Sequence, residues 1–269
     1  MRPRLALCLA LCLSPLALEA EPLSFGLRLP AGSKAAWVMH QEKPLPEGSR
    51  FDIDKEGHAW VLMGPRILFA SDGSTVVMEK PLRDIAFGGS YLAAATDLAV
   101  GRLELRLMKK RVLVAKVHPQ LLLPEPSWRL ASNTASPAVI GFDGERGRGL
   151  LFRVDDQHKI LEWPERILAA VGTEGAWFLS TPSGIERVAP NGAHQYWGVL
   201  PGGASSLAWV KDAGLAVAGP QGVAFFRAPN KIMGLSDAKG ARVRARGNKL
   251  YVLLPEQGGV MQVTGLGAQ

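Results

Sequence analysis

Five arginines recur at one position of a repeated segment, and their type and spacing suit the binding of anions. Each precedes the first apolar stretch of its segment, where packing does not require a charged side chain. The five are Arg50, Arg83, Arg129, Arg166 and Arg242. A guanidinium group donates forked hydrogen bonds that match a carboxylate or a phosphate. If the five side chains converge, they predict a binding site for an anionic small molecule or an acidic peptide.

In an alternative interpretation, these arginines form salt bridges between neighbouring segments or lie in solvent, where ion pairs contribute little free energy. Asp52, Asp54 and Asp84 are close to them in sequence and would neutralise part of the positive charge. The sequence leaves both interpretations open.

Motifs for metal binding or catalysis are incomplete. Residues 52–57 begin like a calcium-binding loop, but Met63 stands where such a loop places its bidentate glutamate, so a hairpin turn is expected. The histidines lack the spacing of metal ligands; they are His40, His58, His118, His158 and His194. Neither a nucleophile elbow nor a P-loop is present, and a Ser-His-Asp set assembled only in three dimensions stays open. From these motifs we predict no catalytic residue, no metal and no cofactor.

Short strands in repeated units would position the arginines. The clearest unit is 51–75, in which apolar runs alternate with turns rich in Gly, Asp and Ser. Strong copies occupy 167–193, 207–230 and 243–263, and weaker ones occupy 82–100 and 129–160. Their first turns follow one another at 32 to 47 residues. Four strands in ~40 residues are the period of propeller blades, in which each sheet covers its neighbours.

The best units, 54–73 and 172–192, share an order of elements: a turn with Gly, a strand that carries Trp60 or Trp177, and a polar turn with Gly. This order resembles the NHL and two-component-regulator type of β-propeller repeat. The likeness covers most of residues 50–265. It implies a fold and a habit of binding, but it does not imply one activity.

We therefore expect an all-β fold with a single β-propeller of six blades, each of four antiparallel strands; five or seven blades stay open. In propellers the first strand of each blade lines the central channel, so the arginines would lie near one mouth. The last unit lacks an outer strand, while alternating stretches at 23–29 and 35–40 precede the first unit. An N-terminal strand is thus predicted to complete the last sheet and close the ring. Four tryptophans are expected to pack between blades: Trp37, Trp60, Trp177 and Trp209.

Residues 1–20 have the pattern of a secretory signal peptide. Arg2 and Arg4 precede an apolar run, and Ala20 offers a small residue at the cleavage site. The run is shorter than the ~20 residues of a membrane helix, although a retained anchor is an alternative. Both cysteines of the chain, Cys8 and Cys12, fall in this segment. We expect residues 21–269 to form the propeller, without disulfides and without a membrane span, in the periplasm or outside the cell.

Charge limits the choice of partners. The chain has 31 basic and 24 acidic residues, and this modest excess in an exported protein makes nucleic acid a poor fit. The hairpin predicted at 102–117 is strongly basic. It could protect a sheet edge from aggregation or offer a surface to an anionic partner. The oligomeric state is left open.

The favoured function from sequence is a non-enzymatic binding or scaffold module in an envelope complex, with an anion-binding channel mouth and an envelope protein or acidic ligand as partner. The alternative is a propeller hydrolase or lactonase with a channel metal. Likeness to calcium-dependent propeller lactonases would imply that Glu, Asn and Asp converge on one ion. Four asparagines are available, but they lie at turns: Asn133, Asn191, Asn230 and Asn248. A quinone-cofactor propeller is set aside because it usually has eight blades.

Overall fold

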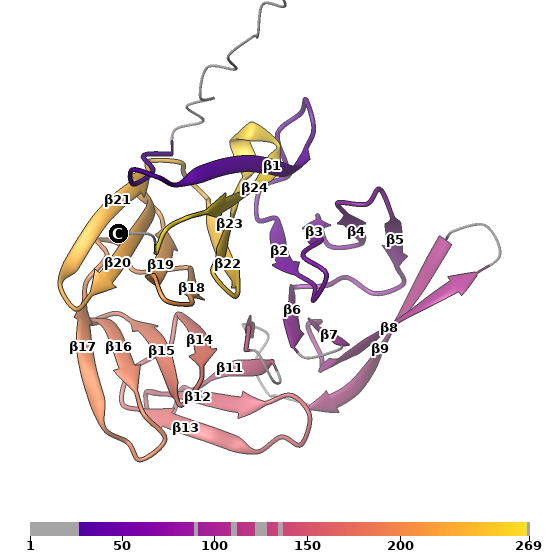
Figure 1. The fold of residues 1–269 in the computed structure, drawn as a ribbon. Helices are drawn as coiled ribbons and strands as arrows, with labels where there is room; N and C mark the ends of the chain where they lie inside the picture. The colour runs from indigo at the N-terminus through magenta and orange to yellow at the C-terminus, as the bar shows by residue number, and fades with distance from the viewer. Residues whose placement is uncertain (1–26, 89–90, 109–111, 122–127, 134–136, 268–269) are drawn as a thin grey trace, which may run out of the picture.

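A computed structural model describes residues 27–88, 91–108, 112–121, 128–133 and 137–267. Six four-stranded blades surround a central axis, and Figure 1 shows β2, β6, β14, β18 and β22 innermost. The predicted six-bladed all-β propeller is confirmed. The predicted signal peptide at residues 1–20 lies outside the described part of the chain.

The first three blades follow one another along the chain, each from an inner to an outer strand. Blade one contains β2 (Arg50–Ile53), β3 (Ala59–Met63), β4 (Ile67–Ala70) and β5 (Thr75–Met78). Blade two contains β6 (Asp84–Gly88), β7 (Tyr91–Ala95), β8 (Val100–Met108) and β9 (Val112–Leu121). Blade three contains β10 (Arg129–Ala131), β11 (Ala138–Asp143), β12 (Arg148–Arg153) and β13 (Lys159–Trp163).

The last three blades include the closure of the ring. Blade four contains β14 (Ala169–Thr173), β15 (Ala176–Thr181), β16 (Gly184–Val188) and β17 (His194–Gly198). Blade five contains β18 (Ser206–Val210), β19 (Gly214–Gly219), β20 (Gly222–Ala228) and β21 (Lys231–Ser236). Blade six contains β22 (Arg242–Arg246), β23 (Lys249–Leu254), β24 (Gly259–Thr264) and the N-terminal strand β1 (Lys34–His40).

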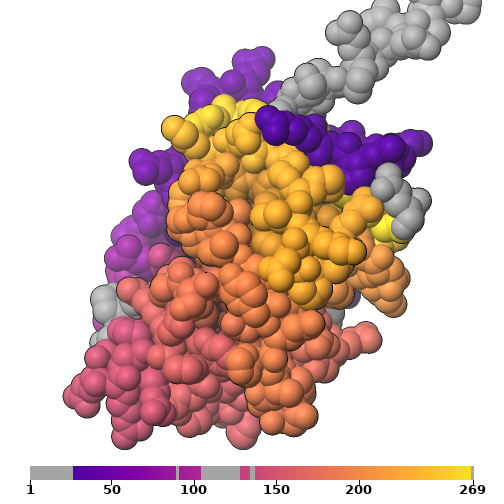
Figure 2. Space-filling view, turned by 90° about the vertical axis from the view of Figure 1, so that its left-hand side faces the viewer, coloured from indigo at the N-terminus to yellow at the C-terminus, as the bar shows by residue number. Residues whose placement is uncertain are grey.

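The closure predicted from the sequence is confirmed. β1 pairs antiparallel with β24 from Lys34–Thr264 to His40–Gly259. In Figure 2 the indigo residues of β1 lie against the gold and yellow residues of the last blade. The two ends of the chain therefore share one sheet, which removes an open edge and ties blade six to the start of the ring.

Apolar packing between neighbouring blades forms the core. One buried cluster lies at each junction around the ring; Ile140 and Leu151 of blade three, for example, pack with Leu179 and Val188 of blade four. A four-stranded sheet cannot bury both faces alone, and the ring supplies a neighbour on each side. The repeats in the sequence are thus the units that cover one another.

Polar contacts on the inner strands add to this packing. The Asp52 carboxylate accepts the N–H of Phe87 in blade two at 2.7 Å, and Asp84 accepts the N–H of Leu130 in blade three at 2.8 Å. In the same way, Ser206 Oγ accepts the N–H of Val243 in blade six at 3.0 Å. These bonds satisfy inner-strand amides that face the neighbouring blade. A buried amide without a hydrogen bond there would be costly.

Blade two departs from the regular pattern. β8 and β9 form a long hairpin, and β9 pairs in parallel with β5, so blades one and two share one continuous eight-stranded sheet. Figure 1 shows the hairpin extending outward beyond β5. The predicted hairpin at 102–117 is present, although its turn at 109–111 lies outside the described residues. At its base, Arg102 pairs with Asp155 of blade three at 2.7 Å.

Helical structure is minimal in the described ranges, where the one helical element is the 3₁₀ turn η1 (Pro255–Gln257). Across those same ranges, no helix has the length and apolar character needed to span a membrane.

Candidate functional site

The inner strands begin at one end of the channel and finish at the other. A cavity of about 620 Å³ lies where they finish, lined by residues that include Asn133, Glu174, Asp212 and Gly247. We call this cavity the wide mouth. A space of only about 10 Å³ lies where the strands begin, lined in part by Asp84, Arg129 and Arg242, and we call this the narrow end. The wide mouth has the volume of a small-molecule site.

The wide mouth carries an excess of positive charge. Five cationic side chains line it: Arg187, Lys211, Arg227, Arg244 and Arg246. Three acidic side chains, Asp52, Glu174 and Asp212, accompany them. Clefts lined by one sign of charge concentrate ligands of the opposite sign. The cavity is therefore suited to a ligand with negative charge.

The Asp52 carboxylate makes structural hydrogen bonds and is not available to a ligand. Its carboxylate accepts hydrogen bonds from the amides of Ile53 and Phe87 and from Ser132 Oγ, at 2.7 to 2.8 Å. Arg244 Nε lies 3.5 Å from its Oδ1. Burial raises the pKa of Asp52, while Arg244 and the three donors act in the opposite direction. These contacts leave Glu174 and Asp212 as the acidic groups at the rim of the cavity.

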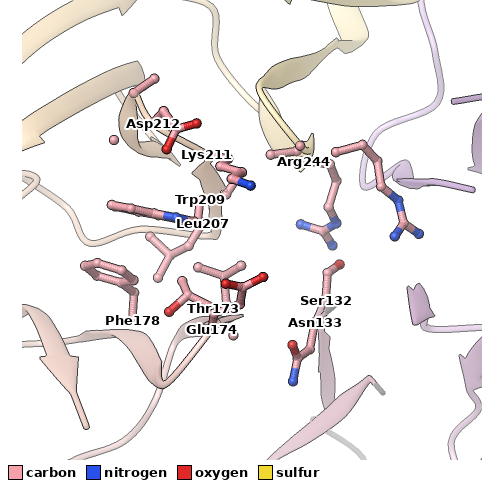
Figure 3. A pocket seen from close by; sticks show the side chains of 18 of the residues that line it. Ser132, Asn133, Thr173, Glu174, Phe178, Leu207, Trp209, Lys211, Asp212 and Arg244 are labelled. Atoms are coloured by element: carbon pink, nitrogen blue, oxygen red, sulfur yellow. The ribbon is translucent and has the colours of Figure 1, made fainter. Parts of the chain in front are cut away.

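Glu174 enters the cavity from a tight turn. Thr173 pairs with Ala176 across the β14–β15 turn, Thr173 Oγ1 donates to the carbonyl of Ala176 at 3.0 Å, and Gly175 has a φ of +80°. The turn fixes the backbone that holds the exposed Glu174 side chain. Figure 3 shows Glu174, Lys211 and Arg244 entering the same space from three blades.

Aromatic rings form one wall. Phe178 and Trp209 stack with ring centres 5.1 Å apart and planes 15° apart, and Trp197 meets Phe178 edge-on at 4.7 Å. Phe178 and Trp209 also line the cavity. Trp209 packs between blades as predicted, and the sequence did not reveal that it also faces the wide mouth. A flat aromatic face suits the ring of a small ligand.

Asn133 depends on a glycine for its place. A Cβ on Gly172 would lie 2.7 Å from Asn133 Cγ, so the side chain can lie against β14 only because residue 172 has none. Of the four asparagines considered from the sequence, Asn133 is the one that lines the wide mouth.

The five predicted arginines divide into two groups. Arg129 and Arg242 line the narrow end, and Arg50 lies close to them, since burial and the charge of Arg50 lower the pKa of Arg242, while burial and the charge of Arg129 lower that of Arg50. Arg83 instead pairs with Asp97 on the surface, and the guanidinium of Arg166 lies 5.4 Å from the centre of the Phe142 ring. The structure therefore brings three of the five together, at the end opposite the larger cavity.

Arg244 and Arg246 line the wide mouth and were missed from the sequence. Both follow Arg242 at intervals of two on β22, so the alternation of a strand points all three to one face. The sequence Arg-Val-Arg-Ala-Arg contains that signal.

Among the described residues, the wide mouth holds no group of three acidic or histidine side chains within reach of one ion. In the part of the chain that the structure describes, the one group of three acidic or histidine ligands within reach of one another is Asp54, Glu56 and His58, which do not line the cavity. Asp54 is already engaged there, since its carboxylate accepts from the amide of His58 and from Trp60 Nε1. Residues 54–58 form the predicted hairpin turn, in which the Gly57 amide donates to the Asp54 carbonyl at 3.2 Å.

Comparison with known proteins places the chain by its fold. No protein-family model and no curated protein matches the sequence. Among solved structures, it is similar to a gluconolactonase from Xanthomonas campestris, with 13% identity, a TM-score of 0.60, and coverage of 87% of this chain and 90% of that one. The calcium-binding protein regucalcin from Agrobacterium tumefaciens gives 15% identity, a TM-score of 0.58, and coverage of 85% and 92%. The PQQ-bound aldose sugar dehydrogenase from Streptomyces coelicolor gives 10%, 0.54, and coverage of 88% and 99%. At these identities the likeness shows a shared β-propeller fold.

These neighbours correct two expectations from the sequence. A non-enzymatic scaffold was favoured, whereas gluconolactonases and sugar dehydrogenases recur among the similar structures, and they favour the hydrolase or lactonase alternative. The cavity of small-molecule size agrees with this change. The expectation that a quinone-cofactor propeller has eight blades is also no reason to set that class aside, because the match covers 99% of a PQQ-bound propeller.

Proposed function

We propose that the wide mouth is the active site of a hydrolase that opens a small lactone or ester carrying a negative charge. One observation carries the proposal: a single cavity of about 620 Å³ holds the exposed Glu174 carboxylate together with five cationic side chains and an aromatic wall. Gluconolactonases among the structurally similar propellers support the reaction class.

The lining indicates the substrate class. The guanidinium groups of Arg227 and Arg246 would hold a carboxylate on the substrate; Arg246 is itself oriented by its Nε and Nη2 bonds to the Ile53 carbonyl. Trp209, backed by the buried Phe178, would lie against the ring of the substrate. A sugar lactone with an added carboxylate satisfies both features, while a neutral lactone satisfies only one.

The reaction needs a base and a group that stabilises negative charge. In the proposed step, the Glu174 carboxylate removes a proton from a water molecule as its oxygen adds to the carbonyl carbon. The positive charge of Lys211 stabilises the oxyanion that forms. The ring C–O bond then breaks, the leaving oxygen takes the proton that Glu174 accepted, and the product is a hydroxy acid with Glu174 again ionised. No step is assigned to calcium, because among the described residues no three acidic or histidine side chains of the wide mouth lie within reach of one ion.

Two predictions from the sequence belong to this proposal. The pattern of residues 1–20 supports export, so the hydrolase would work in the periplasm or outside the cell. The turn and tryptophan order of 54–73 and 172–192 supports a repeat of the NHL or two-component-regulator type.

The test is a hydrolysis assay of residues 21–269 with neutral and carboxylate-bearing sugar lactones, with and without added calcium. We expect hydrolysis, with a preference for the carboxylate-bearing lactones. Glu174→Gln should lower the rate at least 100-fold, which is within the usual range for removing a general base. The matched control is Glu186→Gln, since Glu186 belongs to the same blade, lies outside the cavity and faces His194 at 3.5 Å. Absence of hydrolysis across the panel, or an unchanged rate in Glu174→Gln, would overturn the proposal.

A further inference from the structure

The narrow end gathers buried positive charge. Arg50, Arg129 and Arg242 stand at the first residues of their inner strands, on three different blades. Arg244 reaches the same region from within the channel and lines both the narrow end and the wide mouth. The four guanidinium groups therefore belong to one electrostatic cluster, which we call the arginine cluster.

Carboxylates compensate only part of this charge. The Asp84 carboxylate acts against burial to raise the pKa of both Arg50 and Arg242. Both of its oxygens, however, already accept backbone amides, Oδ1 from Ile85 and Oδ2 from Leu130. Asp52 faces Arg244. Four guanidinium groups thus face two carboxylates, and the hydrogen-bond acceptors of the outer three are backbone carbonyls such as those of Gly48 and Trp128.

Two buried donors in the cluster make no hydrogen bond. Arg50 Nε has no hydrogen-bond partner among the residues that the structure describes, and Arg244 Nε makes only an ion-pair contact with Asp52 Oδ1 at 3.5 Å. The Arg244 side chain is only 8% exposed. A buried charged donor without an acceptor is costly, so the site is built to accept a further partner.

Electrostatics in the cluster agrees with this geometry. Burial lowers the pKa of Arg242 to about 9, and the charge of Arg50 acts in the same direction. Burial also lowers the pKa of Arg50; Asp84 opposes this change, while Arg129 and Arg244 add to it. An added negative charge would offset both effects.

The space at the narrow end sets the size of that partner. About 10 Å³ lies among Asp84, Arg129, Arg242 and Arg244, which is room for about one water-sized atom. A sugar or a peptide side chain does not fit inside. A halide fits with a small adjustment, and so does one oxygen of a phosphate whose remaining atoms stay at the opening.

We propose that the arginine cluster at the narrow end binds a small inorganic anion, held by Arg129, Arg242 and Arg244, which line the space, with Arg50 adding positive charge beside them. This site is distinct from the proposed active site, because it lies at the other end of the channel. The anion neutralises the surplus charge and stabilises the junctions of blades one, three and six.

The test measures unfolding at pH 7 and constant ionic strength, with chloride or phosphate replacing a bulky organic sulfonate. We expect a saturable rise in the unfolding midpoint, and the more effective of the two salts distinguishes a halide from an oxyanion site. Arg242→Gln and Arg129→Gln should each weaken the apparent affinity at least tenfold. The matched control is Arg83→Gln, which removes an arginine at the same repeat position but outside the cluster. The proteins are compared by the change in unfolding midpoint when the anion is added. A difference in their stability without the anion therefore does not affect the comparison.

A second measurement requires no variant. The protein should broaden the NMR line of chloride, and phosphate should narrow it again by competition. The proposal is overturned if the rise in midpoint is linear in salt and equal in the wild type, Arg242→Gln and Arg83→Gln. Lactone hydrolysis should be unchanged in Arg129→Gln, so failure of the anion site and failure of the proposed activity give different results.

Discussion

Arg244 and Asp52 form a buried ion pair between neighbouring blades, with Arg244 Nε 3.5 Å from Asp52 Oδ1 and both side chains less than a tenth exposed. The pair joins β22 of blade six to β2 of blade one. Asp52 also accepts from Phe87 of blade two and Ser132 of blade three. One carboxylate therefore connects four blades, and Arg244 supplies the charge that compensates it.

Arg244→Met should destabilise the protein strongly. The change leaves the Asp52 carboxylate buried without a counter-charge, and breaking a buried pair in this way costs about 3 kcal/mol or more. Denaturant unfolding measures the free energy directly. Asp52→Asn together with Arg244→Met should recover part of the loss, since the amide removes the uncompensated charge. An unchanged unfolding free energy in Arg244→Met would show that the pair does not stabilise the ring.

Arg242→Met, two residues away on the same strand, should have the opposite effect. Arg242 is desolvated by burial and repelled by its neighbours, so its folded pKa of about 9 lies well below its unfolded value. Between these values the unfolded chain binds more protons than the folded one, so the wild type gains stability as pH rises from about 9. The variant should equal or exceed the wild type at pH 7 in a bulky sulfonate buffer, and its advantage should shrink above pH 9. A clear loss at pH 7 would contradict the repulsion.

Ser206→Ala should destabilise the junction of blades five and six. The change leaves the buried amide of Val243 without its acceptor, which costs about 1–3 kcal/mol. The neighbouring Ser205→Ala is the control, because the exposed Ser205 hydroxyl donates to a carbonyl that already accepts the Ser205 amide. Its loss should stay under about 1 kcal/mol. Equal losses in the two variants would argue against a specific bond between blades.

Gly172→Ala should lower the kcat/KM of lactone hydrolysis and have a smaller effect on the free energy of unfolding. The new methyl group would meet the Asn133 side chain, which can turn away into the cavity and obstruct it. We expect a fall in kcat/KM of roughly tenfold, equivalent to ~1.4 kcal/mol. Gly234→Ala is the control, because a Cβ there meets no atom within 4 Å. A normal rate in Gly172→Ala would show that Asn133 does not influence substrate binding or hydrolysis.

The architecture was predictable because its signals are local. Alternating residues define a strand, turns with Gly such as 55–57 end it, and the repeat every ~40 residues predicts blades. The missing outer strand of the last unit even predicted the closure by β1. These features depend on neighbouring residues, which the sequence displays directly.

The residues of the candidate site could be identified only from the closed ring. Arg83 and Arg129 hold equivalent positions in the repeat. Arg83, however, pairs with Asp97 at the surface, while Arg129 lines the narrow end. Likewise, Glu174, Lys211 and Arg244 belong to three separate repeats, and nothing in their spacing shows that they share a cavity. The sequence by itself determined the repeated four-stranded unit and the order of its copies along the chain. The tertiary structure decided which side chains meet, because that depends on the rotation of each blade about the axis and on the partners nearest each side chain.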